Sequence, residues 1–256
     1  MIKVLPVPAF QDNYIWLIHN PTRNCVAIVD PGDAGPVINT LEKMKLKPVA
    51  LLTTHHHGDH VGGVKALLSH YQIPVYGPLG EAIPGITHPL KQGDKIEIPD
   101  LAAKFEIIDV PGHTAGHIAY YGHDKLFIGD TLFMSGCGRL FEGTAAQMHS
   151  SLEKIKALPD KTEIYCAHEY TLANLRFANT VEPGNPDIIQ RIKTSQLARK
   201  NNIPTVPGTL EIEKKTNPFL RLKIADVIAA AENHAGHSLT NSIDVFACIR
   251  QWKDQF

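Results

Sequence analysis

The sequence predicts an α/β protein with a smaller, mainly helical domain at its C-terminus. Two observations lead to this prediction. Up to about residue 170, short apolar runs typical of strands alternate with patterns typical of helices, and several of these runs end in a loop that carries His or Asp. Beyond Tyr170, helical patterns are separated by Pro-containing breaks. We therefore expect an α/β domain over residues 1–170 and a smaller helical domain over residues 171–256.

The individual elements follow from apolar periodicity and from the turn residues between them. Strands are bounded by Pro, Asn and Gly, and the first helix follows an Asp-Pro-Gly-Asp turn. Because ligand groups converge where the strands of an α/β sheet end, the His and Asp residues there are candidates for a site. The predicted strands cover residues 2–7, 14–19, 25–30, 49–53, 104–110, 118–121, 125–128 and 163–166, and the predicted helices 37–44, 61–71, 145–158, 172–179, 187–201, 225–233 and 241–253.

The composition is that of an ordinary globular chain of 256 residues, with 43% apolar and 20% charged side chains. A net charge of −1 does not favour nucleic acid as a partner. No run approaches the length of a membrane span, and the first residues lack the pattern of a secretory signal, so we expect a cytoplasmic protein and, by default, a monomer. The four widely spaced cysteines predict reduced thiols.

The strongest chemical signal is the segment from His55 to His60, which reads His-His-His-Gly-Asp-His. In an extended chain, side chains two apart point the same way, so His55 and His57 can reach one metal ion. Asp59 and His60 lie at the predicted turn into a helix and can face a second ion. Imidazole and carboxylate suit zinc, iron or manganese. An exposed, idle histidine-rich turn is the weaker interpretation.

Two ions need further ligands, and the other strand ends supply them. His113 follows one predicted strand, Asp130 another and His168 a third. Each alone is consistent with a packed or solvated turn residue. Together they complete a ligand set, in which a carboxylate such as Asp130 can bridge two cations.

These motifs resemble the metallo-β-lactamase superfamily, marked by His-x-His-x-Asp-His followed by distant His, Asp and His. Within it, the chain resembles the glyoxalase II family of hydroxyacylglutathione hydrolases nearly end to end. The match runs through Ala9–Tyr14, the histidine motif, Pro111–His117, Gly129–Gly143 and Ala167–Thr171. The segment from Gly136 to Gly143, together with the basic pair Arg250 and Lys253, narrows it to the thioesterase branch.

The resemblance implies a four-layer αβ/βα sandwich and a helical substrate domain. It implies that His55, His57 and His113 hold the first metal ion, that Asp59, His60 and His168 hold the second, and that Asp130 lies between them. Asp59 and Asp130 are thereby also predicted catalytic residues. A glutathione-binding set is implied too, with Phe141 where some members carry tyrosine; it comprises Arg139, Phe141, Tyr170, Arg250 and Lys253.

The implied reaction is hydrolysis of S-(2-hydroxyacyl)glutathione, such as S-D-lactoylglutathione, to glutathione and D-lactate by a metal-bridging hydroxide. This is the second step of methylglyoxal detoxification. Two divalent ions about 3.5–4 Å apart make a shared water acidic enough to supply hydroxide at neutral pH. The thiolate of glutathione then leaves without a strong general acid. Zinc is the first expectation, and iron and manganese are compatible.

Other functions compete with this one. A persulfide dioxygenase would use a single iron, a β-lactamase would lack the C-terminal basic pair, and a nucleic-acid-cleaving relative would carry more basic surface. A metal-storing protein would bind ions without turnover. Asp30 is a candidate acceptor for a ligand histidine or a plain turn residue, and we expect neither His56 nor His117 to be a ligand.

Overall fold

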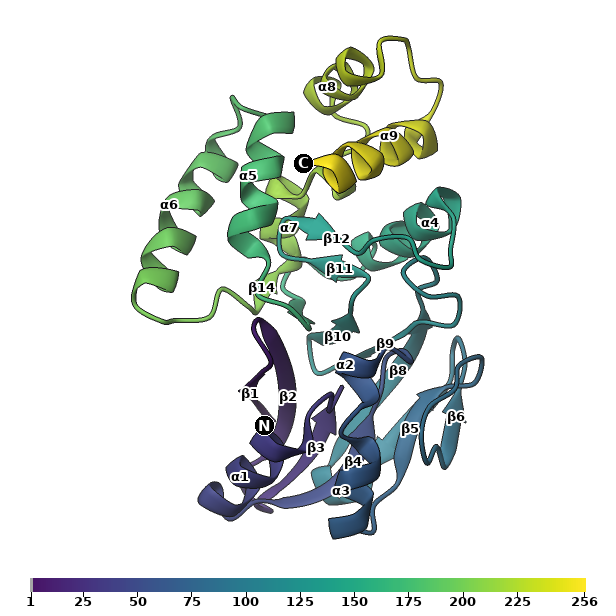
Figure 1. The fold of residues 1–256 in the computed structure, drawn as a ribbon, viewed down its shortest axis with the longest axis vertical. Coiled ribbons are helices and arrows are strands. Elements are labelled where there is room, and N and C mark those ends of the chain that lie inside the picture. Colours follow the sequence, from purple (N-terminus) through teal and green to yellow (C-terminus); the bar gives the residue numbers. More distant parts are fainter. Residues whose placement is uncertain (1) are drawn as a thin grey trace. The chain divides into compact units, whose positions relative to one another are not determined.

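The computed structural model describes residues 2–256 and divides into two compact units (Figure 1). The first unit comprises Met1–Asp109 and Ala115–Gly129, and the second comprises Val110–Thr114 and Asp130–Phe256. This division follows the packing of the chain. It does not test the predicted domains, residues 1–170 and 171–256, whose boundary was placed where the sequence pattern changes after Tyr170.

The first unit contains a mixed sheet with the strand order β1-β2-β3-β4-β5-β6. Its first three strands are antiparallel and the following ones pair in parallel. Parallel strands need a crossover, and α1 and α3 supply the first two. The strands are β1 (Lys3–Ala9), β2 (Asn13–Asn20), β3 (Cys25–Val29), β4 (Lys47–Leu52), β5 (Val75–Pro78) and β6 (His88–Leu90), and the helices are α1 (Ala34–Met44), α2 (Gly58–Val61) and α3 (Val64–His70).

Four antiparallel strands of a second sheet complete the first unit. They are β7 (Lys95–Ile98), β8 (Ala103–Asp109), β9 (Ile118–Gly122) and β10 (Lys125–Gly129), with the short helix η1 (Pro99–Leu101) between β7 and β8. The Tyr120 hydroxyl on β9 donates to the carbonyl of Thr53 just after β4, at 2.8 Å. This bond ties the second sheet to the strand end from which the histidine motif starts.

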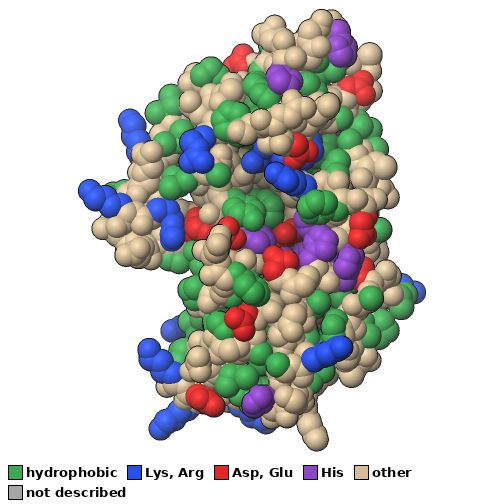
Figure 2. Space-filling view, viewed as in Figure 1, with side chains coloured by type: hydrophobic (Ala, Val, Ile, Leu, Met, Phe, Trp, Pro, Cys, Tyr) green, Lys and Arg blue, Asp and Glu red, His purple; other side chains and the backbone are tan. Residues whose placement is uncertain are grey.

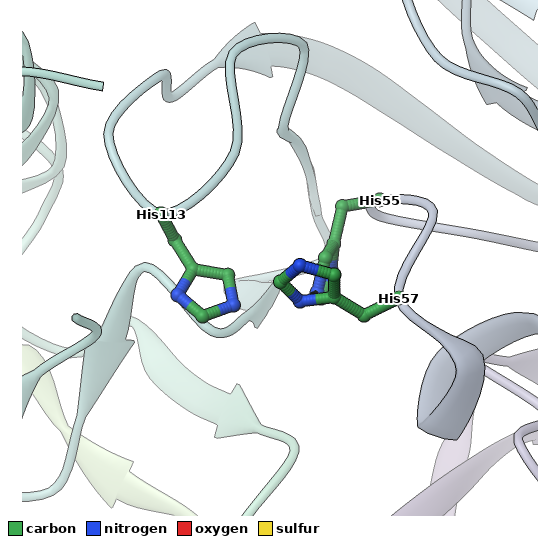
Figure 3. Close-up of side chains that lie close together, drawn as sticks. All are labelled: His55, His57 and His113. Atoms are coloured by element: carbon green, nitrogen blue, oxygen red, sulfur yellow. Dashed lines mark hydrogen bonds between the residues drawn. The ribbon is translucent and has the colours of Figure 1, made fainter. Parts of the chain in front are cut away.

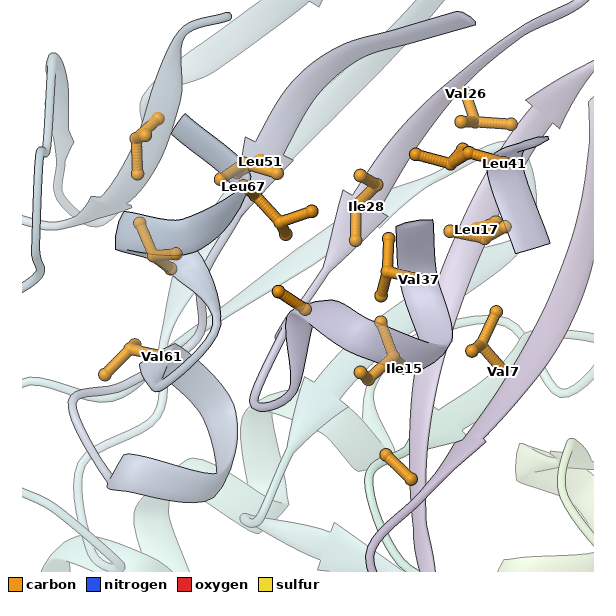
Figure 4. Packing of buried hydrophobic residues seen from close by; sticks show 14 of the residues in the cluster. Val7, Ile15, Leu17, Val26, Ile28, Val37, Leu41, Leu51, Val61 and Leu67 are labelled. Carbon is orange, nitrogen blue, oxygen red and sulfur yellow. The ribbon is translucent and has the colours of Figure 1, made fainter. Parts of the chain in front are cut away.

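The core of the first unit lies between the mixed sheet and its helices (Figure 4). Ile15 and Leu17 alternate along β2 and face Val37 and Leu41 of α1, which are one helical turn apart. Residues on the other face of β2 are buried as well, so the sheet is covered on both sides. This buried frame fixes the end of β4, and with it the segment from His55 to His60.

The sequence predicts one continuous helix over residues 61–71, and the structure shows that this continuity is wrong. The structure has two helices, α2 and α3, separated at Gly62 and Gly63. The Gly63 amide donates to the carbonyl of Pro31 at 2.9 Å, and a Cβ on Gly63 would lie 2.6 Å from the backbone of Ala34. A tertiary contact with the turn before α1 therefore replaces a helical hydrogen bond.

The second unit is mainly helical, and its helices run from the teal α4 through the green α5 to the yellow α9 in Figure 1. The sequence predictions missed α7, which begins at the Thr209 cap and places the buried Glu213 beside Arg191. The elements of this unit are β11 (Leu132–Phe133), β12 (Gly136–Cys137), α4 (Ala145–Lys156), β13 (Glu163–Cys166), α5 (Thr171–Val181), α6 (Pro186–Lys200), β14 (Gly208–Thr209), α7 (Leu210–Thr216), η2 (Pro218–Leu220), α8 (Ala225–Ala235) and α9 (Ser242–Gln255).

Candidate metal centre

The loop after β4 brings His55 and His57 together (Figure 3). The Nε2 atom of His55 lies 3.1 Å from Nδ1 of His57, and the two rings meet nearly edge-on. The prediction that these two side chains face the same side is therefore confirmed. His113, drawn in the same view, comes from the loop that follows β8.

Asp59 and His60 lie in α2, immediately after the two histidines. His60 Nε2 is 3.6 Å from Asp59 Oδ2, and the His60 ring lies 4.0 Å from that of His55. The buried Asn13 amide, at the start of β2, donates to Asp59 Oδ2 at 3.0 Å. The first unit thus gathers all four predicted ligands of the histidine motif in one cluster.

Asp30 supports two of these ligands from behind. Its carboxylate accepts hydrogen bonds from the amide and the hydroxyl of Thr54, both at 2.8 Å. Because the Thr54 proton points to Asp30, Thr54 Oγ1 accepts from His55 Nδ1 at 3.1 Å, which leaves His55 Nε2 facing the metal side. Asp30 Oδ2 also lies 3.1 Å from His60 Nδ1. These contacts favour the acceptor role for Asp30, although its left-handed backbone, with φ of 50°, shows that it also makes the turn before Pro31.

The second unit holds the other three predicted ligands around one carboxylate oxygen. Asp130 Oδ2 lies 3.5 Å from His113 Nε2 and 3.4 Å from His168 Nε2. His113 Nδ1 donates to the carbonyl of Arg139 at 2.9 Å, so its Nε2 atom faces Asp130. A carboxylate oxygen between two imidazoles is the arrangement expected of a ligand shared by two cations.

The spacing of these donor atoms fits divalent metal ions. Two ligands at about 2.0–2.1 Å from one ion, at tetrahedral angles, lie about 3.4 Å apart. The donor pairs within each unit are 3.1 Å to 3.6 Å apart. Nitrogen and carboxylate oxygen without cysteine sulfur also match a catalytic site better than a structural zinc site. His and Asp side chains of the described residues could therefore hold metal ions.

Two glycines permit the close packing around these ligands. Gly129 has a φ of 49°, and a Cβ there would lie 2.3 Å from Thr54 Oγ1 and 2.9 Å from the His117 ring. A Cβ on Gly138 would lie 2.0 Å from the carbonyl oxygen of Asp130. A larger residue at either position would displace the ligands or their supports.

Two aromatic residues of the predicted substrate set lie against ligand histidines of their own unit. The Tyr170 ring stacks on His168, with centroids 4.6 Å apart and planes 7° from parallel. Phe141 is 62% exposed and its ring meets His113 edge-on at 5.2 Å. Each ring therefore limits the movement of an imidazole while keeping surface for a ligand.

The predicted basic residues occupy different environments. Arg139 is exposed and lies 3.6 Å from Asp254, whereas Lys253 is half-buried over the Phe177 ring. Burial, followed by the positive charge of Arg250, lowers the pKa of Lys253 to about 8. Arg250 is buried, donates to the carbonyl of Cys137 at 2.7 Å and pairs with Asp254 at 3.0 Å. Arg250 thus supports the Gly136–Gly138 segment, a role that its sequence position did not predict.

His56 and His117, which we do not expect to be ligands, lie beside the predicted ligand histidines. His117 is buried and stacks on His55 at 4.5 Å, and His56 pairs with Glu81 at 3.0 Å. Sequence reasoning missed the supporting roles of Asn13 and Glu81, because each is an ordinary polar residue far along the chain from the side chain that it contacts. It also missed Asp254, although Asp254 lies one helical turn from Arg250.

Figure 2 shows histidine side chains gathered on one region of the visible face, together with acidic side chains. Such a gathering is consistent with a site for cations. The four cysteines are free, as predicted. Among residues 2–256, no helix is long and apolar enough to cross a membrane.

Comparison with known proteins defines the class first. The model of the metallo-beta-lactamase superfamily matches residues 9–168. The solved structure of ETHE1 from Myxococcus xanthus has the same fold, with a TM-score of 0.68 and 22% identity over 98% of this chain and 91% of that one. The structure of TTHA1623 in a di-iron-bound form has a TM-score of 0.60 and 26% identity, over 84% of this chain and 100% of that one. The predicted metallo-β-lactamase fold is confirmed.

The family within this class follows from the C-terminal region and from full-length relatives. The model of the hydroxyacylglutathione hydrolase C-terminus matches residues 169–256. Hydroxyacylglutathione hydrolases from Nitrosomonas eutropha and Alkalilimnicola ehrlichii are 54% and 51% identical to this chain, and in both cases the match covers all of both proteins. The chain belongs to the hydroxyacylglutathione hydrolase family. The predicted family and the predicted class of enzyme, a hydrolase, are confirmed.

Proposed function

We propose that this chain hydrolyses the thioester of S-(2-hydroxyacyl)glutathione, with S-D-lactoylglutathione as substrate and glutathione and D-lactate as products. The reaction is the second step of methylglyoxal detoxification. The position of Asp130 carries the proposal, because one carboxylate oxygen within 3.5 Å of two imidazoles suits a binuclear centre. The names of the relatives support the substrate class, and the match to these relatives covers the whole chain.

We propose that the predicted ligands hold two metal ions. Two triads that could each hold one ion are His55 with His57 and His113, and Asp59 with His60 and His168. Asp130 is then the shared ligand. Zinc is the proposed metal, and iron or manganese also suit imidazole and carboxylate.

When bound, two such ions supply an acidified water and polarise the carbonyl oxygen of the substrate. The residues of the chain hold this centre in one geometry. Asn13 fixes the side chain of Asp59, and Thr54 fixes the ring of His55. Little rearrangement of these ligands therefore accompanies the reaction. The carboxylate of Asp130 is proposed to orient the attacking water. The leaving thiol has an ordinary pKa near 8.5, so it leaves as thiolate without a dedicated acid.

The glutathione part of the substrate carries two carboxylates, which cationic side chains recognise by charge-assisted hydrogen bonds. Arg139 and Lys253 are proposed to make these contacts, with Tyr170 and Phe141 beside the ligand histidines of their unit. Arg250 is proposed to act mainly by holding the carbonyl of Cys137 in place. A variant such as Arg250→Ala would then lose stability as well as substrate affinity.

The remaining expectations are proposals of the same kind. Residues 1–170 are proposed as the catalytic domain and residues 171–256 as the substrate-binding domain. The partner is the small thioester, with neither nucleic acid nor membrane involved, and the chain acts as a cytoplasmic monomer.

The test is to incubate the purified protein with S-D-lactoylglutathione and to measure thioester loss and D-lactate formation together. Equal amounts of D-lactate and free thiol are expected, and Asp130→Ala serves as the inactive control. Oxygen uptake with glutathione persulfide in place of thioester cleavage would instead favour a persulfide dioxygenase.

A further inference from the structure

A buried carboxylate, that of Glu81, lies behind the histidine motif and has no part in the proposed reaction. Its side chain is 2% exposed. Oε2 lies 3.0 Å from His56 Nδ1, and Oε1 accepts a hydrogen bond from the Gly116 amide at 3.0 Å. A carboxylate can only accept these bonds, so His56 carries its proton on Nδ1. Glu81 thereby joins two loops of the first unit.

Each of these contacts leads to one of the proposed ligands of the first ion. His56 lies between His55 and His57 in the chain, and its ring meets His57 nearly edge-on with centroids 5.0 Å apart. Gly116 precedes His117, whose ring stacks on His55 at 4.5 Å. Glu81 therefore restrains the two ligands from two directions, through different neighbours.

The surroundings of Glu81 are built for this contact. A Cβ on Gly116 would lie 2.6 Å from Glu81 Cγ, so the approach requires glycine. The backbone carbonyl of Glu81 accepts from the Ile83 amide at 3.0 Å, and the Ile83 side chain packs in the core of the first unit. The carboxylate is thus anchored on the hydrophobic core, and the loops are held against it.

We propose that Glu81 is a positioning residue that sets the affinity of the chain for the ion held by His55 and His57. By fixing His56 and the Gly116 amide, it keeps both imidazoles in the orientation that the ion requires before the ion arrives. Restraints of this kind outside the ligand set typically change metal affinity about 10–100-fold. The inference rests on the metal site of the proposed function, but not on the thioester substrate.

The experiment compares Glu81→Ala and Glu81→Gln with Glu97→Gln. Glu97 is an exposed residue of the same unit, paired with Lys104, and is the matched control. Metal-free protein is titrated with cobalt(II) or zinc(II) against a chromophoric chelator, so affinity is read without any turnover. Glu81→Ala is expected to weaken the binding of the ion held by His55 and His57 about 10–100-fold. Equal affinity in Glu81→Ala and the control would overturn the proposal.

Glu81→Gln gives the more specific result. Its amide oxygen can still accept from Gly116, while its amide nitrogen meets His56 Nδ1 as a second donor. We expect a smaller loss of affinity and a change of the His56 tautomer, visible in the nitrogen NMR shifts of the metal-free protein. An unchanged tautomer and unchanged affinity contradict the proposal.

His56→Asn provides a second route if Glu81→Ala does not fold. Removing the imidazole breaks the path to His57 and leaves the Gly116 contact in place. A loss of metal affinity relative to the Glu97→Gln control supports the proposal, and no loss overturns it. A protein that binds metal normally but leaves thioesters intact would refute the proposed function and still permit this test.

Discussion

Thr54 offers a sharp test of how the chain prepares a ligand histidine. Its side chain is buried, donates to Asp30 Oδ2 at 2.8 Å and accepts from His55 Nδ1 at 3.1 Å. Thr54→Val keeps the shape of the side chain and removes only this relay. Asp30 then loses one donor, and His55 Nδ1 loses the acceptor that directs Nε2 towards the metal.

The size of the effect follows from these two bonds. A hydrogen bond to a charged acceptor contributes about 1.5–3 kcal/mol and a neutral one about 0.5–1.5 kcal/mol. Together they predict about 2–4.5 kcal/mol of lost stability in Thr54→Val. Loss of a support for a metal-binding histidine typically costs about 10–100-fold in metal affinity.

The adjacent residue supplies the control. Thr53 is equally buried, but its hydroxyl donates to the carbonyl of Tyr76 at 3.1 Å and does not contact His55. Thr53→Val is therefore expected to lower stability without changing metal affinity. Both variants are compared by urea unfolding of the metal-free protein and by chelator competition. Equal metal affinity in the two variants would refute the relay from Asp30 to His55.

Three further predictions concern other parts of the site. Asp130→Ala removes the carboxylate shared by His113 and His168, and elemental analysis should find fewer than two ions per chain; full occupancy would argue against a bridging role. Gly138→Ala forces a Cβ to within 2.0 Å of the carbonyl oxygen of Asp130, so metal affinity and unfolding temperature should both fall, and an unchanged protein contradicts the close packing. Because the pKa of Lys253 is lowered to about 8, its positive charge is present below that pH and lost above it. The KM for the anionic thioester should therefore rise as the pH increases through 8. Lys253→Met should have a high KM at every pH, without this rise.

Local patterns predicted most of the strands and helices that carry the ligands. The predicted strand over residues 163–166 coincides with β13, and the predicted helix over 225–233 falls within α8. The helix predicted over 61–71 begins only at Val64, because the Gly63 amide bonds to the Pro31 carbonyl, a contact that periodicity does not encode. α7 carried a usable signal, since Thr209 can cap a helix and Asn217-Pro218 ends it.

The ligands were easier to predict than their supports. His55 and His57 are two apart in an extended segment, so their common direction follows from backbone geometry. Asp30 was recognised as a candidate because it follows a strand, but its bonds to Thr54 depend on two strands lying side by side. The burial of Arg250 follows from the packing of α9 against η2 and β12, which no local pattern reports.

The most direct test of the account is metal removal and restoration on the intact protein. The chain is stripped with a chelator, and hydrolysis of S-D-lactoylglutathione is followed while zinc is added back in known amounts. The account predicts no hydrolysis in the stripped protein and recovery that reaches its maximum at two ions per chain. Full thioesterase activity in the metal-free protein would contradict it.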